Sequence, residues 1–386
     1  MIKPSKIQFY PEGFLSYHTS CGIKDNTLDL GVVFSETPAN SAAVFTRNAF
    51  PGEPVKIGRK IIQNGLLQAI VVNSKNANVA TGSDGYENSL KICRKTAQEL
   101  NIPVDSVLPS STGVIGRPLP FEKVLAGLDS LKDQLVNPAD FPGFAAAIMT
   151  TDTFPKFVSA QTGNASIVGV AKGSGMIEPN MATMLSYFFT DAEISSNDLD
   201  RILRSCADKT FNCLSVDSDT STSDTLVIMA NGKAGKVDLV EFENTLLSLC
   251  TDLTKMLARD GEGATKLFIV DVINADSADA AKKIAKSIIN SPLVKTMIYQ
   301  GDPNWGRIYM AVGKTSGVHL REPQIQIFWG KNREIDSSST TALSKYLREN
   351  EELFLTVDMC SGKSSCRVYG CDLTEEYVRI NAFYTT

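Results

Sequence analysis

The stretch KGSGMIEPNMATML, from Lys172 to Leu185, interrupts an otherwise regular alternation of helix and strand patterns. It contains small residues, a Pro-Asn pair and a threonine, Thr183, directly before an apolar run. From Thr183 the sequence reads TMLSYFFT, which is rich in aromatic and β-branched residues and is closed by Asp191. This composition is typical of a β-strand. The stretch therefore places a hydroxyl at the start of a predicted strand, behind the small residue Ala182.

The rest of the chain predicts an α/β protein without a short internal repeat. One helix is expected after Ser195, because Asp198 follows three residues later and completes a capping box. A second has an apolar stripe from Phe242 to Met256, and a third over 276–289 has an acidic start and later lysines, as the helix dipole favours. Short β-branched runs bounded by turn residues predict strands at 29–36, 68–74, 166–171, 225–230 and 265–273.

Composition and charge exclude several classes of protein. The 386 residues are 43% hydrophobic and 21% charged, which is typical of a globular chain with a large core. The formal net charge of −5 and the lack of a long basic stretch argue against a nucleic-acid partner. No apolar run approaches the roughly 20 residues that span a bilayer, and the N-terminal residues lack a signal-peptide core. We expect a cytoplasmic enzyme.

The numbers of cysteines and histidines argue against disulfides, histidine-ligated metal sites and histidine-based catalysis. The eight cysteines form no CxxC pair, and a chain of this length needs no disulfide framework, so we expect reduced and mostly buried thiols. The only histidines are His18 and His319. This scarcity disfavours a histidine-ligated metal site and a Ser-His-Asp triad. If the protein performs nucleophilic chemistry, we expect its base not to be an imidazole.

Several polar loops separate the predicted elements, and two nucleotide-binding motifs are absent from them. Gly173-Ser174-Gly175 does not continue as GxGxxG, and no GxxxxGK[ST] motif occurs. The acidic run Asp217, Asp219 and Asp224 resembles a metal-binding loop in composition. It lacks the glycine and the distal glutamate of a calcium-binding loop, and the alternative is that these side chains cap local turns.

Thr183 is a candidate nucleophile that needs no histidine. Its hydroxyl could attack the carbonyl of Ala182, and hydrolysis of the resulting ester would release a new N-terminus. The α-amine of that terminus, with a reference pKa of about 7.7–8.0, could serve as a general base near neutral pH. Threonine with its own amine is a known substitute for a Ser-His pair. The alternative is that Thr183 is an ordinary strand-forming residue.

The whole chain resembles the ornithine acetyltransferase family, the glutamate N-acetyltransferases of arginine biosynthesis. Family-like motifs occur in family order and cover essentially the entire sequence. They are GIK (22–24) with DLG (29–31), VFTRN (44–48), VVNSKNANVATG (71–82), SSTGVIG (110–116), MTTDTFPK (149–156), KGSGMIEPNMATML (172–185), VDSDTSTSDT (216–225), RDGEGATK (259–266), GDPNWGRI (301–308) and NAFYTT (381–386).

The resemblance implies roles for individual residues. Thr183 matches the nucleophile that accepts the acetyl group, and the bond between Ala182 and Thr183 matches the self-cleavage site. Thr112 and Gly113 match the oxyanion hole, which needs donors of this kind. The substrate-binding positions that the resemblance implies are Thr150, Lys172, Thr183, Glu262, Asn381 and Thr386, with Lys172 suited to a carboxylate and Glu262 to an amine.

The resemblance also implies a fold and a reaction. The fold is an α/β/β/α sandwich that resembles, but is wound differently from, N-terminal nucleophile hydrolases, with a smaller C-terminal α/β part over about 240–386. Cleavage would give an alpha chain, 1–182, and a beta chain, 183–386, and two of each are expected to assemble. The reaction is a ping-pong acetyl transfer from N-acetylornithine to L-glutamate through an acetyl-threonine. No cofactor is implied, and use of acetyl-CoA as a second donor stays open.

Four residues depart from the family pattern, and two other functions stay open. Lys75 and Ser218 occupy positions where glycine is expected, Val79 replaces an alanine and Ser223 an asparagine. The first alternative function is an aminopeptidase or N-acyl amidohydrolase on the same scaffold, although such relatives favour a serine nucleophile. The second is a non-catalytic ligand-binding protein that keeps the fold.

Overall fold

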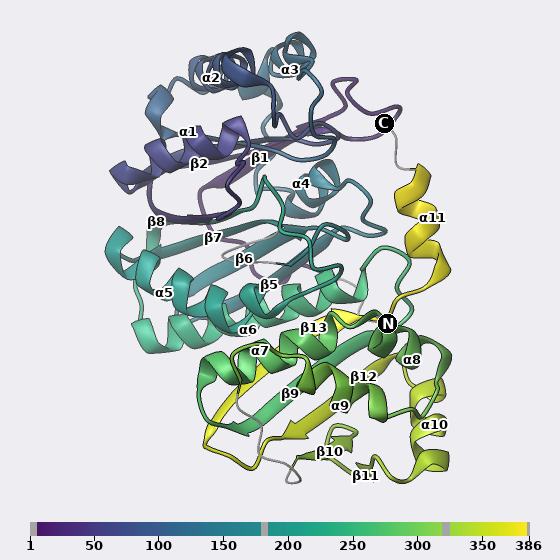
Figure 1. Cartoon of the computed structure of the whole chain (residues 1–386). Helices are drawn as coiled ribbons and strands as arrows, with labels where there is room; N and C mark the ends of the chain where they lie inside the picture. The colour runs from purple at the N-terminus through teal and green to yellow at the C-terminus, as the bar shows by residue number, and fades with distance from the viewer. Residues whose placement is uncertain (1–5, 179–183, 319–324, 384–386) are drawn as a thin grey trace. The chain divides into compact units, whose positions relative to one another are not determined.

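The computed structural model describes residues 6–178, 184–318 and 325–383. The chain forms two compact units (Figure 1). The first unit comprises residues 1–173, 179–212 and 220–253, and the second comprises residues 174–178, 213–219 and 254–386.

The first unit is built on an eight-stranded sheet. Its strand order is β4-β3-β2-β8-β7-β6-β5, with β1 paired to β2. The strands are β1 (Phe14–Thr19), β2 (Leu30–Phe45), β3 (Leu66–Asn73), β4 (Val107–Ser111), β5 (Lys156–Thr162), β6 (Ala165–Lys172), β7 (Leu185–Glu193) and β8 (Thr225–Lys236). The helices are α1 (Glu53–Ile61), α2 (Gly82–Leu100), α3 (Phe121–Gly127), α4 (Phe141–Ile148), α5 (Ser196–Lys209) and α6 (Leu239–Arg259), whose last turns continue into the second unit.

The long strand β2 folds this sheet onto itself. Its first half pairs with β3, its register shifts between Phe34 and Ala39, and its last residues pair with β8. Side chains from both halves of the sheet then share one core. Members of this core are Val33, Ile70, Val72 and Leu108 from one half, Val168, Leu185, Tyr187, Phe189 and Val227 from the other, and Phe141 and Phe144 from α4. Two layers of strands therefore face each other.

Helices cover both outer faces of this double layer (Figure 1). On one side, Val32, Val71 and Val107 alternate with the shared core residues and pack against α2 and α3. On the other side, α5 contacts β2, and a Cβ at Gly169 of β6 would lie within 3.1 Å of Leu253 on α6. The first unit is the expected α/β/β/α sandwich.

The second unit is a smaller α/β layer. Its sheet has the order β11-β10-β12-β9-β13, in which β9 and β12 are parallel. The unit contains β9 (Leu267–Ala275), α7 (Ala278–Ile289), α8 (Pro292–Gln300), α9 (Gly306–Gly313), β10 (Gln326–Trp329), β11 (Ile335–Asp336), α10 (Thr340–Glu349), β12 (Glu352–Asp358), β13 (Ser364–Cys371) and α11 (Glu375–Phe383). One apolar core joins the sheet to α7, α8, α9 and α10, and the stacked rings of Phe268 and Trp329 belong to it.

The predicted elements are present. The five predicted strands correspond to β2, β3, β6, β8 and β9, the strand after Thr183 is β7, and the three predicted helices are α5, α6 and α7. The predicted N-cap is confirmed, because Ser195 Oγ accepts the Asp198 N–H at 3.2 Å, and the Asp198 carboxylate accepts the Ser195 hydroxyl at 2.6 Å. The prediction for β2 was too short. It stopped at the Thr37-Pro38 break, but the strand continues past its register shift to Phe45.

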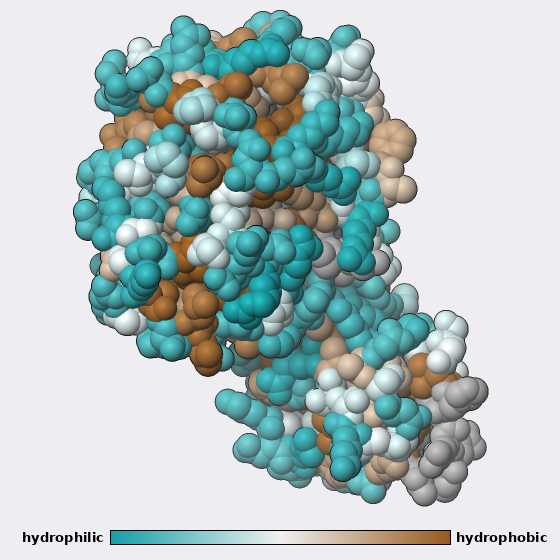
Figure 2. All heavy atoms as spheres, turned by 90° about the vertical axis from the view of Figure 1, so that its left-hand side faces the viewer, coloured by the Kyte–Doolittle hydropathy of each residue, from teal (hydrophilic) through white to brown (hydrophobic). Residues whose placement is uncertain are grey.

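The surface and the cysteines agree with a globular chain. Figure 2 shows one face, on which hydrophilic residues predominate and hydrophobic residues form scattered groups, as is normal for globular proteins. None of the helices in the described ranges is long and apolar enough to cross a bilayer. All eight cysteines are free, and five of them are buried, as the sequence predicted.

Candidate active site

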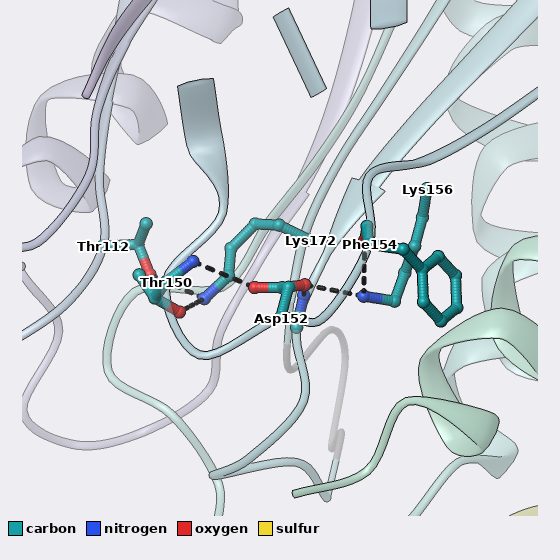
Figure 3. Close-up of polar contacts among 7 residues, drawn as sticks. Thr112, Thr150, Asp152, Phe154, Lys156 and Lys172 are labelled. Atoms are coloured by element: carbon teal, nitrogen blue, oxygen red, sulfur yellow. Dashed lines mark hydrogen bonds and ion pairs between the residues drawn. The ribbon is translucent and has the colours of Figure 1, made fainter. Parts of the chain in front are cut away.

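Lys172, the last residue of β6, connects two threonines that are distant in sequence (Figure 3). Its Nζ donates to Thr112 Oγ1 at 3.0 Å and to Thr150 Oγ1 at 2.9 Å. Thr112 follows β4 and Thr150 follows α4, so three separate elements contribute to this cluster. Lys172 is 91% buried, which excludes the interpretation of a solvated surface charge. Three of the residues implied by the family resemblance therefore meet in the first unit.

A buried carboxylate, Asp152, lies beside this cluster, between it and Lys156 (Figure 3). Asp152 accepts the Thr150 N–H at 3.0 Å and the Gly173 N–H at 2.6 Å. It therefore positions Thr150 and the residue that follows Lys172, which contact each other through the lysine. It also forms an ion pair with Lys156 Nζ at 2.7 Å, and neither side chain has any solvent exposure. Asp152 thus orients Thr150 and the end of β6 without contacting the threonine hydroxyls.

Electrostatics keep Asp152 ionised. Burial alone would raise the pKa of its carboxyl group, but the ammonium groups of Lys156 and Lys172 and the hydrogen bonds from Lys156 and the Thr150 N–H outweigh it and lower the pKa below its usual value. Sequence analysis did not single out Asp152 or Lys156, although both lie in the quoted motif MTTDTFPK. Their spacing gave no signal, because they lie in and after a loop, whereas an i, i+4 spacing brings side chains together only within a helix.

The turn at Thr112 and Gly113 is held against the loop that follows β3. The Thr112 N–H donates to Asn73 O and the Val114 N–H donates to Lys75 O. Gly113 has φ +133°, and a Cβ there would lie 2.1 Å from the Lys75 carbonyl carbon, so only glycine fits. The Gly113 N–H donates to none of the described residues. The turn therefore offers one hydroxyl and one backbone N–H as donors, which is the set that an oxyanion requires.

Glu262 and Asn381 meet in the second unit. Asn381 Nδ2 donates to Glu262 Oε2 at 2.7 Å, and the Glu262 N–H donates to Ser174 O at 2.8 Å. A Cβ at Gly175 would lie 2.3 Å from the Glu262 carboxylate. The glycine of the KGSG sequence therefore leaves space for the carboxylate, and Glu262 has a fixed place beside the motif.

The acidic loop does not form a metal site. Asp217 accepts the N–H of Asp219 in its own loop at 3.3 Å, as the turn-capping alternative predicts, and it also accepts the backbone N–H groups of Met176 at 2.7 Å and Ile177 at 2.8 Å in a segment distant in sequence. Burial raises the pKa of Asp224 well above its usual value. Among the described residues, no group of three or more His, Cys, Asp or Glu side chains could hold a metal ion.

The two residues that replace the glycines expected from the family pattern share a backbone conformation. Lys75 has φ +78° and Ser218 has φ +67°, both in the left-handed region that favours glycine. The backbone thus keeps the shape that glycine would adopt, and each substitution adds a side chain to it. Ala182, Thr183 and Thr386 lie outside the described residues.

Comparisons with known proteins identify the family of this chain. Residues 16–386 match the model of the ArgJ family. The arginine biosynthesis bifunctional protein ArgJ 2 of Clostridium acetobutylicum is 47% identical, over 97% of this chain and 98% of the relative. The glutamate N-acetyltransferase Oat2 of Streptomyces clavuligerus is 43% identical, over 97% of this chain and 98% of the relative. The glutamate N-acetyltransferase of Methanothermobacter thermautotrophicus is 41% identical, over 95% of each chain. The chain belongs to the ArgJ family.

Proposed function

We propose that this protein is a glutamate N-acetyltransferase of arginine biosynthesis that moves an acetyl group from N-acetylornithine to L-glutamate. The names of the three relatives support this activity. The observation that carries the proposal is the Lys172 cluster at the end of β6. Lys172 is paired with Leu185, the first residue of β7, and Thr183 precedes Leu185 by two residues in the sequence.

The reaction proceeds in two half-reactions through an acetyl-enzyme. Thr183 Oγ attacks the acetyl carbonyl of N-acetylornithine and gives its proton to the Thr183 α-amine. When the C–N bond breaks, that proton passes to the leaving nitrogen, and ornithine departs. The α-amine of glutamate then attacks the acetyl ester, and Thr183 Oγ takes a proton back.

Thr112 and Gly113 stabilise the oxyanion in both half-reactions. Because Lys172 Nζ donates to Thr112 Oγ1, that oxygen acts as acceptor toward the lysine, and its own hydrogen is available to the developing negative charge. The positive charge of Lys172 strengthens this donor. The Gly113 N–H supplies the second hydrogen bond. Lys172 and Thr150 are assigned to the substrate carboxylate, and Glu262 and Asn381 to a substrate amine.

The proposal includes maturation and assembly. The chain cleaves itself between Ala182 and Thr183 by an N-to-O acyl shift, and two alpha chains, 1–182, and two beta chains, 183–386, assemble in the cytoplasm. No cofactor is required. Acetyl-CoA is proposed as a second acetyl donor, in line with the word "bifunctional" in the name of the Clostridium acetobutylicum relative.

A half-reaction experiment tests the proposed function against hydrolysis. The protein is incubated with N-acetyl-L-ornithine, with and without L-glutamate, and ornithine, acetate and N-acetylglutamate are measured. We expect a single burst of ornithine without glutamate, and continuous formation of N-acetylglutamate with it. Acetate released at the same rate in both cases would identify an amidohydrolase instead. A second incubation with acetyl-CoA and glutamate tests the second donor.

A further inference from the structure

Glu178 is the last described residue before the cleavage site, and the proposed mechanism does not use it. It lies in the second unit. One oxygen of its carboxylate accepts the Ser215 hydroxyl at 2.6 Å and also accepts Asn290 Nδ2. The other oxygen lies 3.9 Å from Lys286 Nζ. Lys286 is in the last turn of α7 and Asn290 follows this helix, so α7 and the segment Cys213–Asp219 together hold the side chain.

The backbone at Glu178 is held by the same segment. The Glu178 N–H donates to Asp219 O at 2.9 Å, and the Val216 N–H donates to Ile177 O at 2.7 Å. The Asp217 carboxylate accepts the Ile177 N–H at 2.8 Å. Main-chain and side-chain contacts therefore fix Ile177 and Glu178 within the second unit.

The partners of Glu178 are themselves fixed. The Ser215 N–H donates to Tyr369 O at 2.9 Å, and Lys286 Nζ donates to Leu214 O at 2.6 Å. The side chains of Glu178 and Lys286 are 24% and 13% exposed, so water screens their attraction less than it screens a fully exposed pair. Glu178 thus meets two hydrogen-bond donors and one cation on a rigid surface.

The scissile bond lies a short distance along the chain from these contacts. Five residues, 179–183, separate Glu178 from Met184 and contain this bond. Met184 is held as well, because its carbonyl accepts the Thr225 N–H at 3.0 Å. A short segment that is held at both ends has fewer conformations than one that is held at one end. Loss of the Glu178 contacts would therefore release one of the two ends.

Self-cleavage requires a specific approach of two atoms. Thr183 Oγ bonds to the carbonyl carbon of Ala182, the C–N bond between the two residues breaks, and the hydroxyl proton passes to the freed amine. Water then hydrolyses the ester, which regenerates the hydroxyl and leaves a carboxylate on Ala182. Orientation of the reacting atoms is the contribution that the surrounding chain can make to such a step.

We propose that Glu178 is a positioning residue for self-cleavage, which it promotes by holding the chain ahead of the scissile bond. It acts through the chain and not on the reacting atoms. This inference rests on the proposed function, of which self-cleavage is a part, and it goes beyond it by naming a residue that determines the rate of maturation.

Cleavage kinetics of full-length variants test this role. The chain is synthesised in a cell-free system, synthesis is stopped, and its conversion to two bands on a denaturing gel is followed over time. Glu178→Ala removes the hydrogen bonds and the ion pair, and we expect cleavage to be slower by about ten-fold or more. Asp358→Ala is the matched control, because Asp358 lies in the same unit and its carboxylate also accepts an amide, Asn274 Nδ2 at 2.9 Å. Its cleavage rate should stay within about two-fold of that of the unaltered chain.

An exchange of the amide and the carboxylate provides a rescue. Asn290→Asp places a second carboxylate against Glu178 and should slow cleavage by about ten-fold. Adding Glu178→Gln should restore most of the rate, because the new amide can donate to the new carboxylate and its oxygen can still accept the Ser215 hydroxyl. Cleavage of Glu178→Ala at the rate of the unaltered chain would overturn the proposal. So would equal slowing by Glu178→Ala and Asp358→Ala, or a double variant as slow as Asn290→Asp alone.

Hydrogen exchange tests the contacts without altering them. The N–H groups of Met176, Ile177 and Glu178 donate to Asp217 and Asp219. Mass spectrometry should therefore show slow exchange at these three positions, by about ten-fold or more relative to an unstructured peptide. It is measured in the unaltered protein and in uncleaved Thr183→Ala. Exchange at the rate of an unstructured peptide would show that the segment is not held, and would contradict the positioning role.

The two proposals can fail separately. If cleavage depends on Glu178 but no N-acetylglutamate forms, the acetyl transfer is wrong and the positioning role stands. If transfer occurs and Glu178→Ala cleaves as fast as the unaltered chain, the function stands and the positioning role is wrong. A chain that never cleaves overturns the positioning role, and the transfer assay alone then decides the function. Once cleaved, Glu178→Ala should transfer acetyl groups with a turnover within about two-fold of the unaltered protein, and an equal loss of cleavage and turnover would contradict a role confined to maturation.

Discussion

Lys172 donates to two threonine hydroxyls with almost equal geometry, yet the two hydroxyls have different proposed roles. Thr112 belongs to a turn whose neighbouring N–H, at Gly113, is unused by the described residues, so it lies in a two-donor arrangement. Thr150 lies in a loop that Asp152 holds by its N–H. The first arrangement suits charge that develops during reaction, and the second suits a bound substrate.

Two alanine variants separate these roles. Thr112→Ala should lower turnover by about 10²–10³, because one oxyanion donor is lost, and should leave the Michaelis constant nearly unchanged. Thr150→Ala is the matched control, since it removes the other hydroxyl partner of Lys172, and it should mainly raise the Michaelis constant. Steady-state kinetics with N-acetylornithine and glutamate measure both effects. An unchanged turnover in Thr112→Ala would assign Thr112 to substrate binding.

The buried ion pair between Asp152 and Lys156 leads to a stability prediction. Asp152→Asn leaves the fully buried Lys156 without its carboxylate and should cost about 3–5 kcal/mol in the free energy of unfolding. Asp200→Asn is the control, because Asp200 and Arg204 form a partly exposed pair at the same i, i+4 spacing, and its loss should cost less than about 0.5 kcal/mol. Denaturant unfolding measures both values. Similar costs for the two variants would mean that burial does not strengthen the inner pair.

Asp152 also makes the free energy of unfolding depend on pH in the acidic range. The folded pKa of Asp152 lies below its unfolded value, so the unfolded state binds the proton more readily. Its contribution to stability is therefore complete above about pH 4–5 and is lost as the pH falls below that range. Asp152→Asn should flatten the stability profile of the chain between about pH 5 and 3. A profile as steep as that of the unaltered protein would assign acid unfolding to other carboxyl groups.

At the scale of elements, periodicity and capping signals were sufficient to predict most of the secondary structure. The apolar stripe predicted α6, and all five of its residues are buried: Phe242, Leu246, Leu249, Leu253 and Met256. The limit of such signals appears in β2, where the predicted run ended at residue 36 although the strand continues to Phe45 after a register shift. A local sequence pattern indicates only the conformation of its own residues. It contains no information about pairing with β8, which is distant in sequence and extends β2 to Phe45.

The cap of α5 gives the element-scale prediction. Ser195→Ala removes the side-chain acceptor of the Asp198 N–H and should reduce the free energy of unfolding by about 0.5–2 kcal/mol. Ser195→Asp should keep most of the stability, because its carboxylate can accept the same N–H and favours the helix N-terminus. Thermal unfolding followed by circular dichroism compares the two variants. Equal midpoints for both would show that the cap contributes nothing measurable.

At the scale of the whole molecule, the site depends on the folded-over sheet. Lys172 and Thr112 are 60 residues apart and lie on β6 and after β4, near opposite ends of the strand order. They meet only because β2 folds one half of the sheet over the other. Sequence periodicity contains no signal for this contact, and the resemblance to a family supplied these residues instead. Asp152 had no such assignment, and its role emerged only from the structure.

The same topology determines what self-cleavage should do. A cut between Ala182 and Thr183 would leave β1 to β6 on one chain and β7 and β8 on the other. However, β7 pairs with β6 along six residue pairs from Ile167–Thr190 to Lys172–Leu185, and β8 pairs with β2 along six pairs from Asn40–Ala230 to Phe45–Thr225. The two chains would thus interlock within one sheet and share its core. The cut therefore divides the layer that contains β5, β6, β7 and β8 between the two chains.

We therefore expect cleavage to be invisible under native conditions. The protein should give two bands on a denaturing gel, with masses of 1–182 and 183–386, but one species by size-exclusion chromatography. Thr183→Ala should give a single band and no acetyl transfer, with a thermal midpoint close to that of the cleaved protein, because the strand pairing is unchanged. Mass spectrometry of the separated chains locates the cut. A fully active protein that remains one chain of 386 residues would contradict self-cleavage and would require a base other than the Thr183 amine.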